Sequence, residues 1–244
     1  MTPPLLAILV PTLPERRPLL ARLLRRLRPQ RTGVQVVTLE DRGYMLIGEK
    51  RQRLLEDPRV TAPFVAFIDD DDLVSPDYCP RVLAAIRGGA DVVGFRLRCY
   101  FDGELEGEAV HSLAMGTWLH EPGKADADGN NRTLSFYRRT PNHLNPIRRE
   151  IALSVGYRTM RSGEDSDYSL RLFNAHGASM KEEFIDAYLY HYYCRAKIAR
   201  PPRVWDEDGR LTYEGAEQAI RQGGTAVWRG KSCGTIEELE AVGP

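Results

Sequence analysis

Four consecutive aspartates are the residues of this chain with the most evident chemistry. They are Asp69, Asp70, Asp71 and Asp72, and they directly follow the apolar residues 65–68. Four adjacent carboxylates repel one another at neutral pH, and only a divalent cation or a strong set of hydrogen-bond donors offsets that repulsion. Oxygen ligands on a short turn suit Mg²⁺ or Mn²⁺, which are usually shared with substrate phosphates. The run therefore predicts a metal-diphosphate site with Mn²⁺ or Mg²⁺ as the cofactor.

The acidic run has two other interpretations. A solvated acidic turn is the first, because runs of charge commonly lie on the surface. The second is a calcium-binding EF-hand loop, which needs spaced acids, a central Gly and a Glu at its twelfth position. Counted from Asp69 or Asp70, that spacing fails at Leu73 or Val74. The metal-diphosphate site is the interpretation that the pattern favours.

The composition of the 244 residues is that of an ordinary soluble protein. Charged residues make up 28% and hydrophobic residues 42%, and the net charge is zero. A nucleic acid or an anionic membrane would therefore have to be bound by a local patch. There is no apolar run of about 18 residues and no secretory signal, and four isolated cysteines fit a reducing compartment. The sequence predicts a cytoplasmic protein, in the host cytoplasm if it is viral, with no membrane partner.

Strand-like and helix-like segments alternate through the first hundred residues. The predicted strands are residues 5–10, 34–39, 63–68 and 91–100, and the predicted helices are residues 18–27, 48–56 and 76–86. This alternation, with apolar strands, indicates a mostly parallel, doubly wound α/β sheet flanked by helices. The turn at 101–103 predicts a hairpin. The aspartates follow a strand, which is where open α/β sheets bind their ligands.

The rest of the chain is less regular. Residues 118–139 are polar and contain glycine, so a loop or lid is predicted there. Further helices are predicted at 149–155 and 165–175, and further strands at 184–185 and 187–192. We expect one domain over residues 1–200, with a nucleotide half of about 1–100 and an acceptor half of about 101–200. Residues 201–244 are expected to form a short C-terminal arm that packs on this domain.

Other candidate ligands stand where the predicted strands and helices meet. Thr12 and Glu15 follow the first strand, Asp41 follows the second, and Lys50 and Arg51 lie at the start of a helix. Backbone N–H groups and positive charge at the start of a helix can bind a phosphate. The chain has neither a dinucleotide-binding GxGxxG motif nor a phosphate-binding GxxxxGK[ST] motif. Composition alone favours surface positions for Lys50 and Arg51, whereas their place beside Asp41 favours a ligand role.

The order of motifs resembles that of family 2 glycosyltransferases, which have the GT-A fold. The motifs are ILVPT, VVTLEDRG, GEKRQRLLE, FVAFIDDDDLVSPDY, NHLNPIRREIA, GEDSDYSLRL and YHY, and they span residues 5–193. The resemblance implies a Rossmann-like sheet, a nucleoside-diphosphate sugar donor with UDP as the expected nucleotide, and a Mn²⁺ or Mg²⁺ cofactor. The overall sequence, with HLNPIRREIA before GEDSDY, is also similar to uncharacterised glycosyltransferases of phages and environmental viruses.

The resemblance further implies roles for single residues. Asp71 becomes the principal metal ligand, and Asp69 and Asp70 lie near the cation and the ribose. The family positions that contact the base and the ribose match Thr12, Glu15, Asp41 and Arg51. The chain departs from the family where Pro14 and Gln52 stand in place of asparagines.

Glu164 and Asp165 are the candidates for proton transfer. An inverting transfer needs a base that takes the proton of the acceptor hydroxyl as its oxygen attacks the anomeric carbon. Similarity to the Glu-Asp motif of the family nominates Asp165 as this base, with Glu164 as the second choice. Both residues also suit the start of a helix, where the helix dipole favours acidic side chains, and the two roles can coexist.

Histidines supply the remaining candidates. His191 lies in an apolar, strand-like segment, which is typical of a packed core histidine. Some relatives place a metal-binding histidine after the last core strand, so His191 is also a candidate third metal ligand. His143 and Arg148 are predicted to face the acceptor. A solvated surface is the only context evident for His111, His120 and His176.

Together these features predict a metal-dependent inverting glycosyltransferase. The alternatives are a sugar-phosphate nucleotidyltransferase, which needs a Gly-rich loop after the first strand, and a non-catalytic nucleotide- or carbohydrate-binding module. The acceptor is either a saccharide or a hydroxymethylated pyrimidine flipped out of viral DNA. Seven arginines within residues 16–31 form either a solvated helix face or a patch that follows DNA phosphates.

Overall fold

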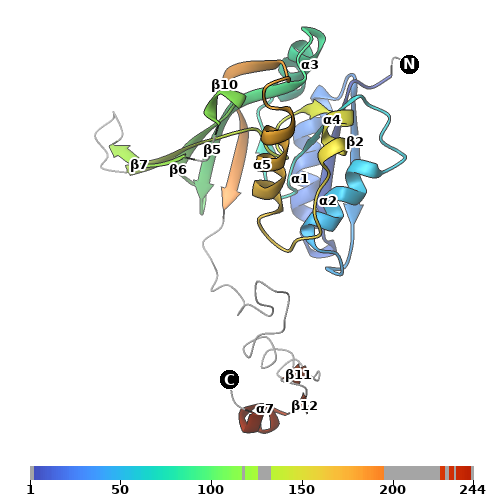
Figure 1. Ribbon diagram of the computed structural model, residues 1–244, viewed down its shortest axis with the longest axis vertical. Coiled ribbons are helices and arrows are strands. Elements are labelled where there is room, and N and C mark those ends of the chain that lie inside the picture. Colours follow the sequence, from blue (N-terminus) through green and yellow to red (C-terminus); the bar gives the residue numbers. More distant parts are fainter. Residues whose placement is uncertain are drawn as a thin grey trace. The chain divides into compact units, whose positions relative to one another are not determined.

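The computed structural model describes residues 3–116, 119–125, 133–194, 226–228, 231–233 and 235–242. Residues 1–194 and residues 195–244 form two compact units, and each is described by itself. The first unit is an α/β structure in which one large sheet has helices on both faces (Figure 1).

The N-terminal part of the sheet is built on three parallel strands, β1 (Leu6–Thr12), β2 (Val34–Glu40) and β3 (Phe64–Phe67). β1 lies in the middle and pairs with both neighbours. All of its residues are buried, as expected for a parallel strand that is covered on both faces. Helices α1 (Arg17–Leu27) and α2 (Ile47–Glu56) lie in the two connections. The predicted alternation of strands and helices is confirmed.

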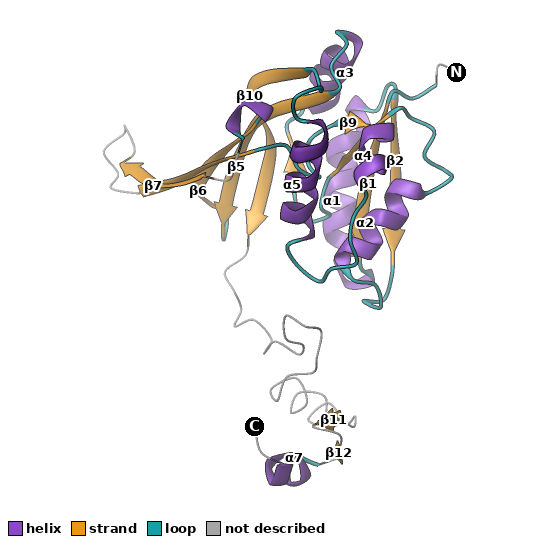
Figure 2. Cartoon of the chain, viewed as in Figure 1, coloured by secondary structure: helices purple, strands orange, loops and turns teal. Residues whose placement is uncertain are grey.

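Successive side chains of β1 pack into two separate hydrophobic clusters, as the two-residue period of a strand requires. Ile8 lies in a cluster with α1 and with α3 (Tyr78–Arg87). Leu9 lies in the other cluster, with α2, α4 (Arg149–Val155) and α5 (Glu164–His176). Figure 2 shows α2, α4 and α5 in front of β1, with α1 behind it. The sheet is therefore held between two helical layers.

Seven more strands extend the sheet beyond β3. They are β4 (Leu73–Val74), β5 (Val92–Phe101), β6 (Glu104–His111), β7 (Leu119–Ala125), β8 (Thr133–Arg139), β9 (Ile147–Arg148) and β10 (Glu182–Cys194). Short 3-10 helices are η1 (Pro14–Arg16), η2 (Arg28–Gln30) and η3 (Leu113–Met115). The strand order is β2-β1-β3-β9-β5-β6-β8-β7, with β10 paired to β5 and β4. β9 is antiparallel to both β3 and β5, whereas the long pairing of β10 with β5 is parallel.

The prediction of a loop or lid at 118–139 is wrong for two parts of that segment. β7 pairs antiparallel with β8, and β8 pairs parallel with β6. The register of β7 shifts between Glu121 and Lys124, where Pro122 and Gly123 interrupt the strand. Such residues are tolerated in a strand at the edge of a sheet, so the composition concealed β7. The polar residues 126–131 lie outside the described residues.

The predicted hairpin at 101–103 is confirmed, and one other strand prediction is corrected. Asp102 (φ 49°) and Gly103 (φ 89°) form the tight turn between β5 and β6, and positive φ at both positions is characteristic of a type I′ turn. The two strands predicted at 184–185 and 187–192 are the single strand β10. Its pairing with β5 shifts register on both sides of Tyr188, and this irregularity explains the apparent break.

The second unit contains an antiparallel pair, β11 (Ala226–Trp228) and β12 (Lys231–Cys233), and the helix α7 (Ile236–Val242). The packing of residues 201–244 on the first domain stays a prediction. Among the described residues, no helix has the length and apolar character needed to cross a membrane.

The turn that carries the four aspartates is fixed to the last strand of the domain. The buried carboxylate of Asp72 accepts hydrogen bonds from the Tyr190 hydroxyl at 2.6 Å and from the Tyr193 backbone N–H at 2.7 Å. The Tyr190 hydroxyl also accepts the backbone N–H of Asp69 at 3.3 Å. Asp72 is therefore a structural member of the run, which leaves the other three carboxylates for the site.

This arrangement predicts that Tyr190→Phe lowers the free energy of unfolding by about 1–3 kcal/mol, because buried polar groups lose a hydrogen-bond partner. Tyr44→Phe is the matched control, since Tyr44 is 84% exposed. Chemical denaturation of both variants measures the difference. Equal stability of the two variants would show that the Tyr190 hydroxyl does not hold the turn.

Candidate active site

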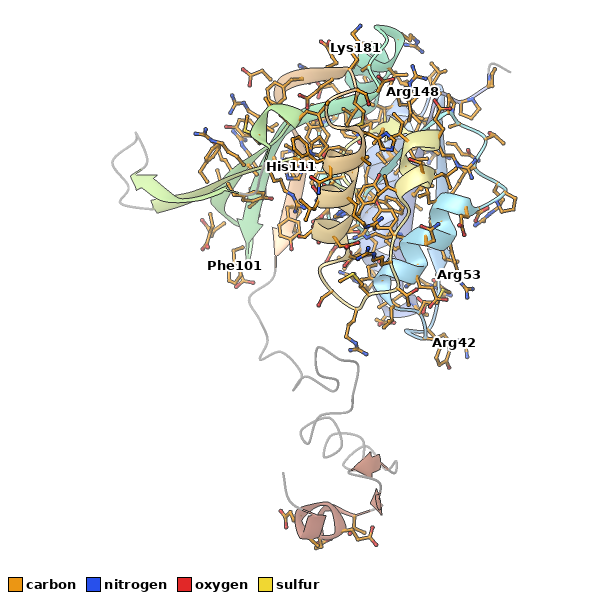
Figure 3. The ribbon with its side chains drawn as sticks, viewed as in Figure 1. Arg42, Arg53, Phe101, His111, Arg148 and Lys181 are labelled. Atoms are coloured by element: carbon orange, nitrogen blue, oxygen red, sulfur yellow. The ribbon has the colours of Figure 1, made fainter. Side chains whose placement is uncertain are left out.

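The predicted ligands lie along one edge of the sheet. Thr12 ends β1, Asp41 directly follows β2, and Asp69 lies just beyond β3. Because the three strands are parallel, their carboxyl ends share an edge, where α/β sheets bind ligands. Figure 3 shows Arg42 at this edge and Arg148 at the opposite one.

Asp70 and Asp71 share one guanidinium group. Arg16 lies 3.1 Å from Asp70 Oδ1 and also forms a close ion pair with Asp71. The Thr12 hydroxyl donates to Asp70 Oδ2 at 2.7 Å, and Arg22 Nη2 donates to the Asp71 backbone oxygen at 2.6 Å. Burial and the neighbouring carboxylates nevertheless raise the pKa of both Asp70 and Asp71. The turn can therefore accept further positive charge.

Arg51 connects the acidic turn to α5. Its Nε lies 3.1 Å from Glu164 Oε1, and its Nη2 lies 3.1 Å from Asp69 Oδ1. Burial opposes the charged form of this side chain, but the carboxylates of Asp69 and Glu164 outweigh that effect and raise the pKa of Arg51. Burial likewise opposes ionisation of Asp69, and Arg51 and His143 outweigh it and lower the pKa of Asp69. Arg51 is thus beside Asp69, as the sequence suggested.

The charge of Lys50 is paired within the protein. It forms a buried ion pair with Asp41, and its Nζ donates to the Thr12 backbone oxygen at 3.0 Å. Asp41 Oδ2 also accepts the backbone N–H of Met45 at 2.9 Å. The pair therefore fixes the ends of β1 and β2 relative to each other. Glu15 lies in η1 and is exposed.

A cavity of about 370 Å³ opens beside Asp69. Its polar lining includes Asp69, His111, Arg139, Asn142, His143 and Asp165. Aromatic rings form part of its wall, from Tyr100, Phe101, Tyr137 and Tyr192. Asp69 and Asp165 are far apart in sequence, and the fold brings them to one cavity.

The two candidate bases face different partners. Glu164 is buried against Arg51, whereas Asp165 lines the cavity. Asp165 Oδ2 lies 3.0 Å from Arg139 Nη1 and 3.5 Å from Asn142 Nδ2. Burial opposes ionisation of Asp165, but His143 and Arg139 outweigh it and lower the pKa of Asp165. This carboxylate is therefore ionised at neutral pH and can accept a proton.

The two residues also occupy the first turn of α5, as the helix-start interpretation requires. Gly163 is the N-cap residue, with φ 77°, and its position supplies no side-chain cap. Acidic side chains in the first turn are favoured by the helix dipole. Both roles are therefore compatible with the position of Asp165.

His143 lies in the cavity wall, with its Nε2 3.6 Å from Asp69 Oδ2. Burial and Arg51 lower the pKa of His143. The contact of His143 with the acceptor stays a prediction. Arg148 does not share this position, because it pairs with Asp91 and lies over the ring of Phe64, at the start of β3. The predicted acceptor contact of Arg148 is therefore corrected to a structural ion pair.

His191 lies among aromatic and cationic groups. Its ring centroid is 5.9 Å from that of Tyr100. Burial, Arg98 and Arg26 lower the pKa of His191. Within the described residues, no group of three or more His, Cys, Asp or Glu side chains is arranged to hold a metal ion. The surroundings of His191 do not support its predicted role as a third metal ligand.

The acidic turn nevertheless fits a cation that is shared with a substrate. Asp69 Oδ1 and Asp70 Oδ1 are buried oxygens that make ion-pair contacts but accept no hydrogen bond. The side chain of Asp71 is 33% exposed, so it can be reached from solvent. Mg²⁺ is commonly bound by one or two carboxylates together with substrate phosphates and water. Asp70 and Asp71 are the residues that would hold such an ion.

Four residues of this site were not predicted from the sequence. Arg16 neutralises the acidic turn, and Arg139 and Asn142 contact Asp165. His111 was assigned to a solvated surface, but it is 1% exposed and lines the cavity. The only available signal was the asparagine-rich motif around Asn142, which the sequence analysis used for family resemblance alone.

Comparison with known proteins agrees with this fold. The family model of glycosyl transferase family 2 matches residues 58–152, which include the acidic turn. A curated relative, "Putative glycosyltransferase EpsH" of Bacillus subtilis (strain 168), is 28% identical, and the match covers 74% of this chain. The chain spans 51% of the length of that relative.

Solved structures of S. aureus TarS share the fold. The structure of TarS 1–349 is 16% identical with a TM-score of 0.51, over 77% of this chain and 60% of that one. Its complex with UDP-GlcNAc is 14% identical with a TM-score of 0.54, over 89% of this chain and 64% of that one. The chain is thus similar to glycosyl transferase family 2 over residues 58–152, and it shares its fold with the solved TarS structures.

The buried His111 predicts a pH dependence of stability. Burial and the nearby Arg139 lower the pKa of His111 to about 3, whereas the unfolded chain has the ordinary histidine value near 6.5. The unfolded state therefore binds the proton first as the pH falls. The stability that neutral His111 contributes is complete above about pH 6.5 and decreases from there towards pH 3.

Between pH 7 and pH 4 we therefore expect wild type to lose up to about 3 kcal/mol more stability than His111→Phe, whose ring has no nitrogen to protonate. Urea unfolding of both proteins at each pH gives this difference, and comparing the two proteins cancels the titration of the carboxylates. A parallel loss in the two proteins would mean that His111 titrates normally.

Proposed function

We propose that the protein transfers a sugar from a nucleoside-diphosphate sugar to an acceptor hydroxyl, with UDP as the expected nucleotide. The proposed reaction requires a divalent metal ion and inverts the configuration of the anomeric carbon. One observation carries this proposal. Asp69, from the acidic turn of the nucleotide half, and Asp165, from the start of α5, line one cavity. This arrangement supports a donor site and a base that face one cavity.

The donor is assigned to the edge formed by β1, β2 and β3. At this edge Arg16 supplies one cationic group, and Asp70 and Asp71 supply two anionic groups. Arg51 forms an ion pair with Asp69. TarS, which shares the fold, has been solved with UDP and with UDP-GlcNAc. A UDP-sugar is therefore the first donor class to test.

The metal supplies positive charge at the leaving diphosphate when it is bound, and stabilising such developing charge is commonly a large term in catalysis. The residues of this chain do the rest. Arg16 faces the same carboxylates and is placed to contact a phosphate oxygen once a cation shares their charge.

Asp165 is the proposed base. Its carboxylate takes the proton of the acceptor hydroxyl, the hydroxyl oxygen forms a bond to the anomeric carbon, and the bond from that carbon to the diphosphate oxygen breaks. Arg139 and Asn142 hold Asp165 in place through the contacts described above. Attack from the face opposite the diphosphate inverts the anomeric configuration.

The cavity favours a saccharide as the acceptor, because its wall combines aromatic rings with polar groups. A hydroxymethylated pyrimidine in DNA remains a second acceptor. Against it, Arg22 of the arginine-rich segment is engaged with the Asp71 backbone and lies over the ring of Tyr193. Both acceptor classes belong in one screen that measures UDP release from UDP-sugars with glycans and with hydroxymethylated DNA. Failure to release UDP with any donor would favour a non-catalytic binding module.

Metal dependence predicts that EDTA abolishes UDP release and that Asp71→Ala lowers it by roughly 10²-fold or more. Asp77→Ala is the matched control, because Asp77 lies near the same turn but is half exposed and forms an ion pair with Arg81 on α3. Circular dichroism checks that each variant is folded. Full turnover in EDTA would exclude the metal assignment.

Proton acceptance by Asp165 predicts that Asp165→Asn lowers turnover by roughly 10²–10⁴-fold while UDP binding is kept. The amide has nearly the same shape and can still accept from Arg139. Asp167→Asn is the control in the same helical turn, since Asp167 pairs with Arg158 and Arg171. If Asp165→Asn stays within threefold of wild type, the base lies elsewhere and Glu164 is the next residue to test.

A further inference from the structure

His111 is held rigidly in the wall of the cavity. It is the last residue of β6, and its ring stacks on Phe95 with centroids 6.4 Å apart and planes at 19°. On another side it lies 6.0 Å from the ring of Tyr137. The side chain is 1% exposed, so its orientation is fixed by packing.

The orientation of Asn145 determines which nitrogen of His111 carries the proton. Asn145 Nδ2 donates to the Val93 backbone oxygen at 2.9 Å, and Asn145 Oδ1 accepts the backbone N–H of Asn142 at 3.0 Å. The amide cannot flip without losing both bonds. Because His111 Nδ1 lies 3.0 Å from the same Oδ1, Nδ1 must be the protonated nitrogen.

His111 Nε2 is then unprotonated and can only accept a hydrogen bond. Burial keeps the ring neutral, so Nε2 has a lone pair and no hydrogen. Among the described residues it has no hydrogen-bond partner, although it is buried. Leaving a buried polar atom without a hydrogen-bond partner lowers the stability of the protein. Where the chain itself offers no partner, a water molecule, an ion or a ligand usually supplies one. The cavity is the space from which that partner can come.

The chemistry of the lone pair restricts the partner. A hydrogen-bond acceptor needs a hydrogen-bond donor as its partner, which is a hydroxyl or an N–H group. Ionised phosphate oxygens, carboxylate oxygens and ether oxygens are excluded, because they carry no hydrogen. The position restricts it further. The strand order places β6 beyond β9 and β5 from β3, on the acceptor side of Asp69. Tyr100 and Tyr192 supply aromatic wall to the same cavity, which suits the apolar face of a sugar ring.

We propose that His111 Nε2 accepts a hydrogen bond from a hydroxyl of a saccharide acceptor and thereby selects how that acceptor is oriented towards Asp165. This inference rests on the proposed function. It makes His111 a specificity-determining residue of the acceptor subsite. The proton of the reacting hydroxyl still goes to Asp165, so His111 contacts a second hydroxyl of the acceptor.

The first test needs no substitution. In protein labelled with ¹⁵N at histidine, the Nε2 resonance of His111 reports a new hydrogen bond directly. The probes are the methyl glycosides of glucose, galactose and N-acetylglucosamine. A saturable shift of Nε2 with at least one glycoside supports the proposal, and no shift with all three overturns it.

Variants test the same contact in binding and turnover. His111→Phe keeps the ring but removes both nitrogens, and His111→Gln restores an acceptor oxygen near the position of Nε2. We expect glycoside affinity, measured by ligand-detected NMR, to fall about tenfold or more in His111→Phe and to recover at least partly in His111→Gln. His176→Phe is the control, because His176 lies at the far end of α5 and its ring forms a hydrogen bond with Ser154. Glycoside affinity in His111→Phe within twofold of wild type would overturn the proposal.

UDP release separates this inference from the proposed function. In a working transferase, His111→Phe raises the KM for the acceptor about tenfold, while UDP affinity stays unchanged. A protein that binds glycosides through His111 but releases no UDP from any UDP-sugar would contradict the transferase proposal and not the contact. A KM for the acceptor unchanged in His111→Phe would contradict the contact and not the transferase.

Discussion

The site depends on one electrostatic constraint, which is that carboxylates from a single turn are held together at the end of β3. Arg16 contacts Asp70 and Asp71 from the loop after β1. Arg51 contacts Asp69 from α2. Removing one partner of a buried ion pair leaves an uncompensated charge, which is strongly destabilising. The first strand, the second helix and the acidic turn must therefore be correctly placed before a donor site exists.

Arg51 carries this constraint to α5. Its guanidinium lies between Asp69 and Glu164 and sits 5.3 Å from the ring of Phe67. Glu164 opens α5, so the same contact positions the following residue, Asp165, in the cavity. One buried side chain thus connects the nucleotide edge to the proposed base. In the proposed mechanism Glu164, although acidic and adjacent to Asp165, is therefore a positioning group.

The sequence predicted the parts of the fold that local patterns determine. Apolar runs marked β1, β2 and β3, and the residues after them marked the ligand edge. Pairing between distant side chains has no local signal, so Arg16 and Arg139 were missed, and Lys50, which was expected beside Asp41 as a ligand, instead forms an ion pair with it. The burial of His111 also depends on contacts between segments. Its ring packs against Phe95 of β5 and Tyr137 of β8, and residues 133–139 of β8 were predicted as part of a loop.

The central claim is that the acidic turn binds a metal-diphosphate unit while Arg16 shares the charge of Asp70 and Asp71. Anomalous diffraction from crystals of the protein with UDP and Mn²⁺ tests this claim most directly. The account predicts a manganese peak in contact with the Asp71 carboxylate and the diphosphate, with Arg16 moved from Asp71 towards a phosphate oxygen. Bound UDP without manganese at the turn, and with Arg16 still on both aspartates, would contradict it.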